Sequence, residues 1–173
     1  MEITEILSQR ILLLDGSMGV ELRKLAPDES TVRGRRFLTH RRSLVSNLDI
    51  LNLSRPDLVS SVYDAYLKAG ADIIETNTFD SNALSQREYA TDSLVRELNL
   101  IGAKLAVEKA KLNLKRREIE YELQKKNFEN QRQLYEIGGV TKNSLEQQKI
   151  SLESTGAEIE ILKKEIEISS LGL

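Results

Sequence analysis

The chain has 173 residues, of which 40% are hydrophobic and 30% charged, and its formal net charge at pH 7 is −2. This near balance of charge gives no reason to expect a nucleic-acid partner. Cysteine is absent, which excludes disulfide bonds, thiol catalysis and thiolate metal sites; the single histidine, His40, lies in an Arg-rich stretch that we interpret as an exposed loop. The N-terminal residues do not resemble a signal peptide, and no apolar stretch approaches the roughly 20 residues of a membrane span. We therefore expect a cytoplasmic location without membrane insertion.

Two short apolar segments predict a pair of parallel β-strands. Residues 11–14 form a continuous apolar run that ends at Asp15, which is typical of a buried parallel strand entering a turn. Residues 71–79 begin apolar and end polar, and they predict a second strand, whereas residues 50–53 fit either a short strand or an ordered loop. Parallel strands are joined by a right-handed crossover, so the polar residues that follow both strands are expected at one edge, where α/β folds bind ligands.

Helices are predicted around these strands. The polar residues 22–47 have no clear period and predict a loop with at most a single helical turn. A helix is expected to begin near Pro56 and to end at Gly70 in the left-handed conformation. Further helices are expected over residues 82–89 and 93–110. The buried stripe of the helix after Pro56 is predicted to comprise Leu58, Val62, Ala65, Tyr66 and Ala69.

From Lys111 onward the sequence changes to a heptad pattern on both sides of Gly138 and Gly139. The repeating apolar residues are Leu114, Tyr121, Phe128 and Tyr135, followed by Leu145, Leu152, Ile159 and Ile166. This pattern predicts an antiparallel coiled-coil hairpin with its turn near residues 138–141. Gly156 is expected either to weaken the second helix or to permit close approach of the first. The N-cap candidates of the second helix are Thr141, Asn143 and Ser144.

The junction between the two kinds of sequence lies near Ala110. Between residues 93 and 137, Gly102 is the only residue that weakens a helix, so one long helix is expected to run across this junction.

Four segments of the first part carry a family resemblance. They are residues 11–19, 33–37, 47–57 and 69–79. From about Leu7 to about Glu108, their order and spacing resemble the N-terminal part of the homocysteine-binding domain of the cobalamin-dependent methionine synthase family. The resemblance implies a (β/α)8 barrel that binds homocysteine and activates its thiol on zinc, with cobalamin and methyltetrahydrofolate acting through other domains.

The resemblance also implies a set of substrate-binding residues. In that family the segment after the first strand holds the amino-acid end of homocysteine, and the end of the second strand lines the same site. The corresponding residues are Asp15, Gly16, Ser17, Glu75, Asn77, Thr78 and Phe79. A carboxylate suits the substrate ammonium, and backbone N–H groups of a turn suit its carboxylate. The alternative is that Asp15 and Asn77 only cap loops.

Two departures from the family lead us to expect no methyltransferase activity. The family holds its zinc with cysteines, which this chain lacks, so no metal site and no cofactor are expected here. About two of the eight βα units of the barrel are recognisable, and two strands cannot close a barrel. Their exposed edges predict self-association.

The second part resembles the α-helical hairpin of periplasmic adaptor, or membrane-fusion, proteins of efflux and secretion systems. Residues 130–146 carry this resemblance, which implies that the hairpin tip contacts an outer-membrane channel through Leu134 and Thr141. Asn130 stands where the family has an arginine, with Arg132 nearby, so this contact departs from the family pattern. A generic helical hairpin without such a partner is the alternative.

The combined prediction is an α/β plus α chain in two domains. Residues 1–110 are expected to form a partial (β/α)8-barrel fragment with two parallel strands, and residues 111–173 an antiparallel coiled-coil hairpin. Three functional interpretations follow: an inactive fragment of a homocysteine methyltransferase, an interaction hairpin of a transport system, or a chimera without selected function.

Overall fold

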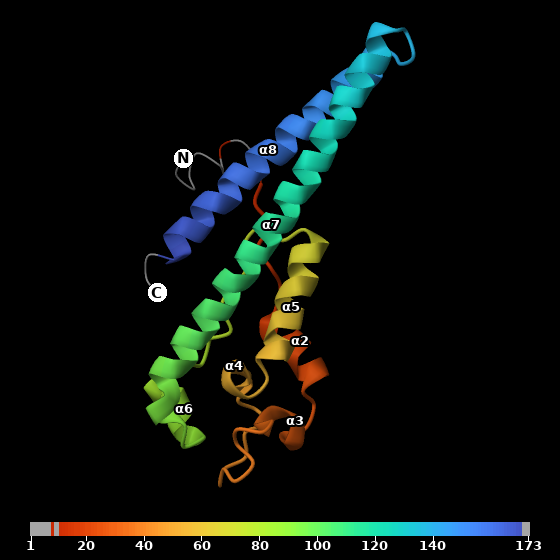
Figure 1. The fold of residues 1–173 in the computed structure, drawn as a ribbon. Helices are drawn as coiled ribbons and strands as arrows, with labels where there is room; N and C mark the ends of the chain where they lie inside the picture. Colours follow the sequence, from red (N-terminus) through yellow and green to blue (C-terminus); the bar gives the residue numbers. More distant parts are fainter. Residues whose placement is uncertain (1–7, 9–10, 171–173) are drawn as a thin grey trace. The chain divides into compact units, whose positions relative to one another are not determined.

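The computed structural model describes residue 8 and residues 11–170, and helices form most of this part of the chain (Figure 1). These residues divide into two compact units, residues 11–109 and residues 110–170. Helix α7 (Val95–Glu136) is continuous and contributes to both units, which confirms the long helix expected across the junction. None of the described helices is long and apolar enough to cross a membrane.

The predicted pair of β-strands is wrong, and so is the partial (β/α)8-barrel fold class. Among the described residues there is no strand and no sheet, only a single parallel bridge between Leu14 and Ile73. The bridge is closed by the N–H of Asp15, which donates to the carbonyl of Ile73 at 2.9 Å. The N–H of Leu13 donates to the carboxylate of Asp72 at 2.9 Å. In a longer β-ladder the same N–H would donate to a backbone carbonyl of the neighbouring strand. Leu13 and Leu14 remain 55% and 57% exposed, whereas parallel sheets are stable when both faces are buried.

The first unit is instead built from short helices connected by ordered loops. They are α2 (Met18–Leu25), α3 (Glu29–Arg33), η1 (Leu48–Ile50), α4 (Leu51–Ser54), α5 (Pro56–Ala69), α6 (Ala83–Glu88), η2 (Asp92–Leu94) and the start of α7. Helices α2 and α3 lie where mostly loop was predicted, and α4 replaces the strand or loop expected at residues 50–53. Side-chain caps explain the first two, because Ser17 accepts the N–H of Val20 and Asp28 accepts the N–H of Thr31.

One apolar core joins the helices of this unit. Its fully buried members are Leu22, Val32, Leu44, Ile50, Leu51, Val59, Tyr63 and Leu98. Helix α5 begins at Pro56 and ends before Gly70, whose φ of 103° is left-handed, so both predicted ends are confirmed. Its buried residues are Val59, Val62, Tyr63 and Leu67, so the buried stripe is centred differently from the predicted one. Contacts with α2 and α4, rather than with a sheet, account for this shift.

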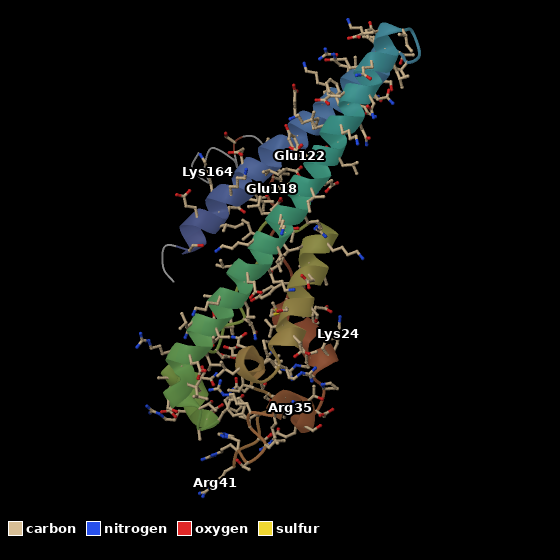
Figure 2. All side chains as sticks on the ribbon, viewed as in Figure 1. Lys24, Arg35, Arg41, Glu118, Glu122 and Lys164 are labelled. Carbon is tan, nitrogen blue, oxygen red and sulfur yellow. The ribbon has the colours of Figure 1, made fainter. Side chains whose placement is uncertain are left out.

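The second unit is a pair of antiparallel helices, formed by the later part of α7 and by α8 (Lys142–Ser170) (Figure 1). The hydroxyl of Thr155 donates to the side-chain carbonyl of Gln124 at 3.0 Å and links the two helices. At Gly156, an added Cβ would lie 3.2 Å from the ring of Tyr121, so this glycine does permit close approach of the first helix. Charged side chains line the hairpin, among them Glu122 (Figure 2).

The hairpin turn is fixed by backbone hydrogen bonds after α7. The N–H of Gly139 donates to the carbonyl of Leu134 at 2.8 Å, and the N–H of Gly138 donates to the carbonyl of Tyr135 at 3.0 Å. Gly138 has a φ of 77°, which completes a Schellman C-cap. Thr141 then caps α8, because its hydroxyl accepts the N–H of Ser144 at 3.2 Å. The turn predicted near residues 138–141 is therefore present.

Candidate functional site

The first unit contains a cleft of about 710 Å³ at the polar ends of the two segments that meet at the Leu14–Ile73 bridge. The bridge brings residues 15–17 beside residues 75–80, although 60 residues separate them in the chain. The cleft is lined by Gly16, Ser17, Met18, Gly19, Arg23, Ser46, Leu48, Asp49, Glu75, Thr76, Asn77, Thr78, Phe79 and Asp80. Six of the seven predicted substrate-binding residues are in this set, and the seventh, Asp15, lies directly beside it.

Asp15 connects the two sides of the cleft. One oxygen, Oδ2, accepts the backbone N–H of Glu75 at 3.0 Å. The other oxygen, Oδ1, is buried and has no hydrogen-bond partner among the described residues. Burial raises the pKa of Asp15, the Glu75 N–H lowers it, and the negative charge of Glu75 raises it, with a net upward shift. A partly buried carboxylate with an unused acceptor oxygen, next to a second carboxylate, is suited to bind a cationic group.

Ser17 and Gly16 shape the opposite wall of the cleft. Ser17 ends the first segment by capping α2, and its carbonyl accepts the hydroxyl of Tyr66 at 3.3 Å. Gly16 lies so close to the same ring that an added Cβ would be 2.8 Å from the Tyr66 hydroxyl oxygen. A side chain at position 16 would therefore have to displace Tyr66 from this wall.

Asn77 is hydrogen-bonded to neighbouring parts of the first unit. It is 5% exposed, and its side-chain amide donates to the carbonyl of Leu48 at 3.0 Å. Its backbone N–H donates to the hydroxyl of Tyr63 at 3.0 Å, and its carbonyl accepts the side-chain amide of Asn52 at 2.7 Å. Burial raises the pKa of Tyr63 to about 12. Asn77 thus fastens the cleft wall to α4 and α5, and its expected role in substrate binding stays a prediction.

The remaining predicted residues of this wall differ in exposure. Phe79 is 94% exposed, so its ring is accessible at the mouth of the cleft. The hydroxyl of Thr78 shares a 2.6 Å hydrogen bond with that of Thr76. The side chain of Glu75 is exposed, and the backbone N–H of Glu75 donates to the carboxylate of Asp15, which fixes the position of this residue.

Asp49 is a lining residue that was not predicted. It is 5% exposed, and its Oδ2 accepts the N–H of Asp80 at 2.8 Å and the hydroxyl of Ser81 at 2.7 Å. Burial raises the pKa of Asp49, although these two hydrogen bonds oppose the shift. A signal for it was present, since Asp49 lies inside the segment 47–57 that carries the family resemblance.

The donor set of the first unit does not fit the zinc of the resembling family. The chain has no cysteine and one histidine. No group of three His, Asp or Glu side chains suited to a metal ion occurs within the described residues. No reaction step is therefore assigned to a metal here.

The residues predicted for the hairpin tip both take part in forming the turn. The carbonyl of Leu134 accepts the N–H of Gly139, while its side chain is 42% exposed. Thr141 is the N-cap of α8. These contacts give both residues a role within the hairpin, and the expected contact with an outer-membrane channel stays a prediction.

Comparison with known protein families identifies a match over most of the chain. Residues 12–140 match the model of the homocysteine S-methyltransferase family. The match includes every residue that lines the cleft, and it extends along α7 to the hairpin turn, through residues that were expected to belong to the adaptor-like part. The chain therefore belongs to the homocysteine S-methyltransferase family.

Proposed function

We propose that the first unit binds homocysteine, or a closely related amino acid, in the cleft beside Asp15. One observation carries this proposal. The Oδ1 atom of Asp15 is buried and has no hydrogen-bond partner among the described residues, and the exposed carboxylate of Glu75 lies beside it. An α-ammonium group at this point would give Asp15 the hydrogen bond that its environment leaves unmade. An unpaired buried acceptor is costly, and a charged partner offsets that cost.

The opposite end of an amino acid can be received by the wall that contains Gly16 and Ser17. Both residues line the cleft, and the backbone N–H groups of such a turn are suitable donors to a carboxylate. Arg23 also lines the cleft and adds a cation. The exposed ring of Phe79 provides apolar surface for the side chain of the substrate. The cleft thus combines anionic, cationic and apolar groups, as a zwitterionic amino acid requires.

Zinc-dependent methyl transfer is not part of this proposal. The thiol of homocysteine is activated by becoming a thiolate on zinc, and this chain offers no cysteine ligand for that ion. We propose that the chain binds the amino acid without methylating it, as an inactive relative of the methionine synthase type. Zinc-dependent formation of methionine by the purified chain would contradict this part of the proposal.

The binding proposal can be tested by calorimetric titration of homocysteine into the full chain and into Asp15→Asn. The variant keeps the size of the side chain but removes its charge, and we expect binding to weaken about tenfold or more. Asp57→Asn is the control, because Asp57 is 61% exposed at its side chain, pairs with Arg55 and does not line the cleft. Equal affinity in Asp15→Asn and the control would refute the assignment of the ammonium to Asp15.

A further inference from the structure

A second site candidate lies in the basic loop, defined here as residues 33–43. This loop contains five arginines and His40, and it has no acidic residue. Such a concentration of positive charge is unusual in a chain whose net charge is −2. The basic loop is therefore locally positive, although the net charge of the whole chain is negative.

The loop is ordered by contacts that use only part of this charge. The guanidinium of Arg33 donates to the carbonyls of Phe37 at 3.1 Å, His40 at 2.6 Å and Arg42 at 3.0 Å, which closes the loop on itself. Arg36 makes a two-point ion pair with Glu97 on α7, at 2.9 and 2.7 Å. These contacts order the backbone of the loop without using the side chains of Arg41 and Arg42.

The charges of Arg41 and Arg42 are not used in this way. Both side chains are exposed, and neither forms an ion pair with any described residue. Arg41 extends outward from the loop (Figure 2). A cavity of about 330 Å³ is lined by Arg36, Phe37, Thr39, His40, Arg41, Arg42 and Ala90, and it shares no residue with the amino-acid cleft. Two uncompensated guanidinium groups therefore border a preformed hollow.

One residue that lines this cavity, Ala90, has a strained backbone conformation. Among the described residues, Ala90 is the one non-glycine residue with a positive φ, at 55°. The Tyr89 carbonyl that precedes it lies 2.7 Å from Nε2 of His40. Because a carbonyl only accepts, Nε2 is the nitrogen that donates in this contact. Phe37 packs edge-on against the same imidazole, with ring centroids 6.1 Å apart. Residues in strained conformations gather at functional sites, and the carbonyl that precedes Ala90 orients the imidazole of His40.

We propose that this cavity binds the phosphate group of an anionic ligand. Guanidinium groups match the geometry of phosphate oxygens and donate two hydrogen bonds each. Two cations beside the imidazole suit a dianionic phosphate better than a single carboxylate, because the larger ligand charge offsets more of the local field. The phosphate can belong to a soluble compound or to a lipid headgroup, since the cavity is open at the surface and both present the same chemistry.

The test is calorimetric titration of the full chain with inorganic phosphate at low ionic strength, in the wild-type chain and in three single variants. Arg41→Gln and Arg42→Gln are each expected to weaken phosphate binding by about tenfold, since each removes a charge-assisted pair. Arg35→Gln is the matched control: it removes the same charge from the same loop, but Arg35 does not line the cavity. All three side chains are exposed, and circular dichroism will show that the variants remain folded.

The outcomes separate a site from diffuse attraction. Wild-type affinity retained in Arg35→Gln but lost in Arg41→Gln and Arg42→Gln supports the proposal. Absence of phosphate binding by the wild-type chain, or an equal loss in all three variants, overturns it. Vesicles of phosphatidylcholine with and without phosphatidic acid form a second arm. Capture that requires phosphatidic acid and Arg42 supports the site with a lipid headgroup as its source, and phosphate binding without vesicle capture supports it with a soluble source.

Discussion

Replacing Gly102 with alanine is expected to destabilise the first unit, although the same change usually stabilises a helix. Gly102 lies inside α7, where it faces the cleft wall and α4. A Cβ built at this position would be 2.6 Å from Cγ2 of Thr78 and 2.8 Å from the side-chain nitrogen of Asn52. Both distances are far below van der Waals contact, so one of the three segments must move.

The expected magnitude follows from three opposing contributions. Alanine gains up to about 1 kcal/mol over glycine in a helix interior. Inserting a methyl group into a filled site costs about 1–3 kcal/mol. The amide of Asn52 donates to the carbonyl of Asn77 at 2.7 Å, and disturbing that buried hydrogen bond costs a further ~1 kcal/mol. The free energy of unfolding of this unit should therefore fall by about 1–3 kcal/mol.

Hydrogen exchange resolved by peptide is the appropriate assay, because the chain has two units and a global transition would mix them. In Gly102→Ala, exchange should accelerate in peptides that cover residues 74–80 and the first turns of α7. Gly156→Ala is the control in α8, where the added Cβ would be 3.2 Å from the ring of Tyr121, which is only partly buried. That ring can give way by a few tenths of an ångström, so the control should be near neutral. A more stable first unit in Gly102→Ala would refute the packing argument.

Three further predictions concern single positions. Ala90→Gly should stabilise the first unit by about 0.5–1 kcal/mol, because it relieves a left-handed alanine at the end of α6, as thermal unfolding will show; an unchanged or lower melting temperature would contradict this. Gly138→Ala should destabilise the hairpin by about 1–2 kcal/mol through its φ of 77° alone, since no atom lies within 4 Å of the added Cβ; unchanged exchange rates in α8 would argue against it. Burial opposes ionisation of Glu29, but hydrogen bonds from Ser43, Leu44 and Arg33 lower its pKa to about 2, so its contribution to stability is present above pH ~4.5 and is lost as the pH falls toward 2. Acid titration monitored by circular dichroism should show this loss in the wild-type chain and a flatter profile in Glu29→Gln.

The sequence indicated the helices better than the extended segments. Helix α5 was predicted at both ends because Pro56 and Gly70 act locally, through a fixed φ and a left-handed φ. The strands expected at residues 11–14 and 71–79 are absent from the described residues, and the two segments meet only at the single parallel bridge between Leu14 and Ile73. A strand depends on neighbours that cover it, and this dependence is not visible in the apolar run itself.

The error at α4 has a different origin. A short apolar run such as residues 50–53 does not distinguish a strand from a buried helix. The helix buries Asn52 at 1% exposure, where its amide reaches the carbonyl of Asn77. That contact spans 25 residues of sequence and cannot be read from local preferences.

The residues expected at a substrate site lie together in the structure, although the fold around them differs from the prediction. Six of the seven expected substrate-binding residues line one cleft, and Asp15 adjoins it, because the single bridge between Leu14 and Ile73 is enough to bring the two segments together. Asp49 was missed because its carboxylate reaches the cleft only after the turn at Asp80 and Ser81 has formed. The side chain of Asn77 was expected to bind a substrate, and its amide donates to the carbonyl of Leu48 and to the side chain of Asn52 within the wall. Substrate binding by Asn77 stays a prediction.

The glycine turn between α7 and α8 also bears on how the hairpin forms. Closing a loop of a few residues costs little chain entropy, so contacts next to the turn are the first that can form. The hydrogen bond between Thr155 and Gln124 spans 31 residues and becomes accessible only as the helices close from the turn outward. We therefore expect the two helices to pair from Gly138 outward, toward residue 110. A defect at the turn should therefore slow assembly of the hairpin, whereas a defect at its open end should mainly hasten its opening.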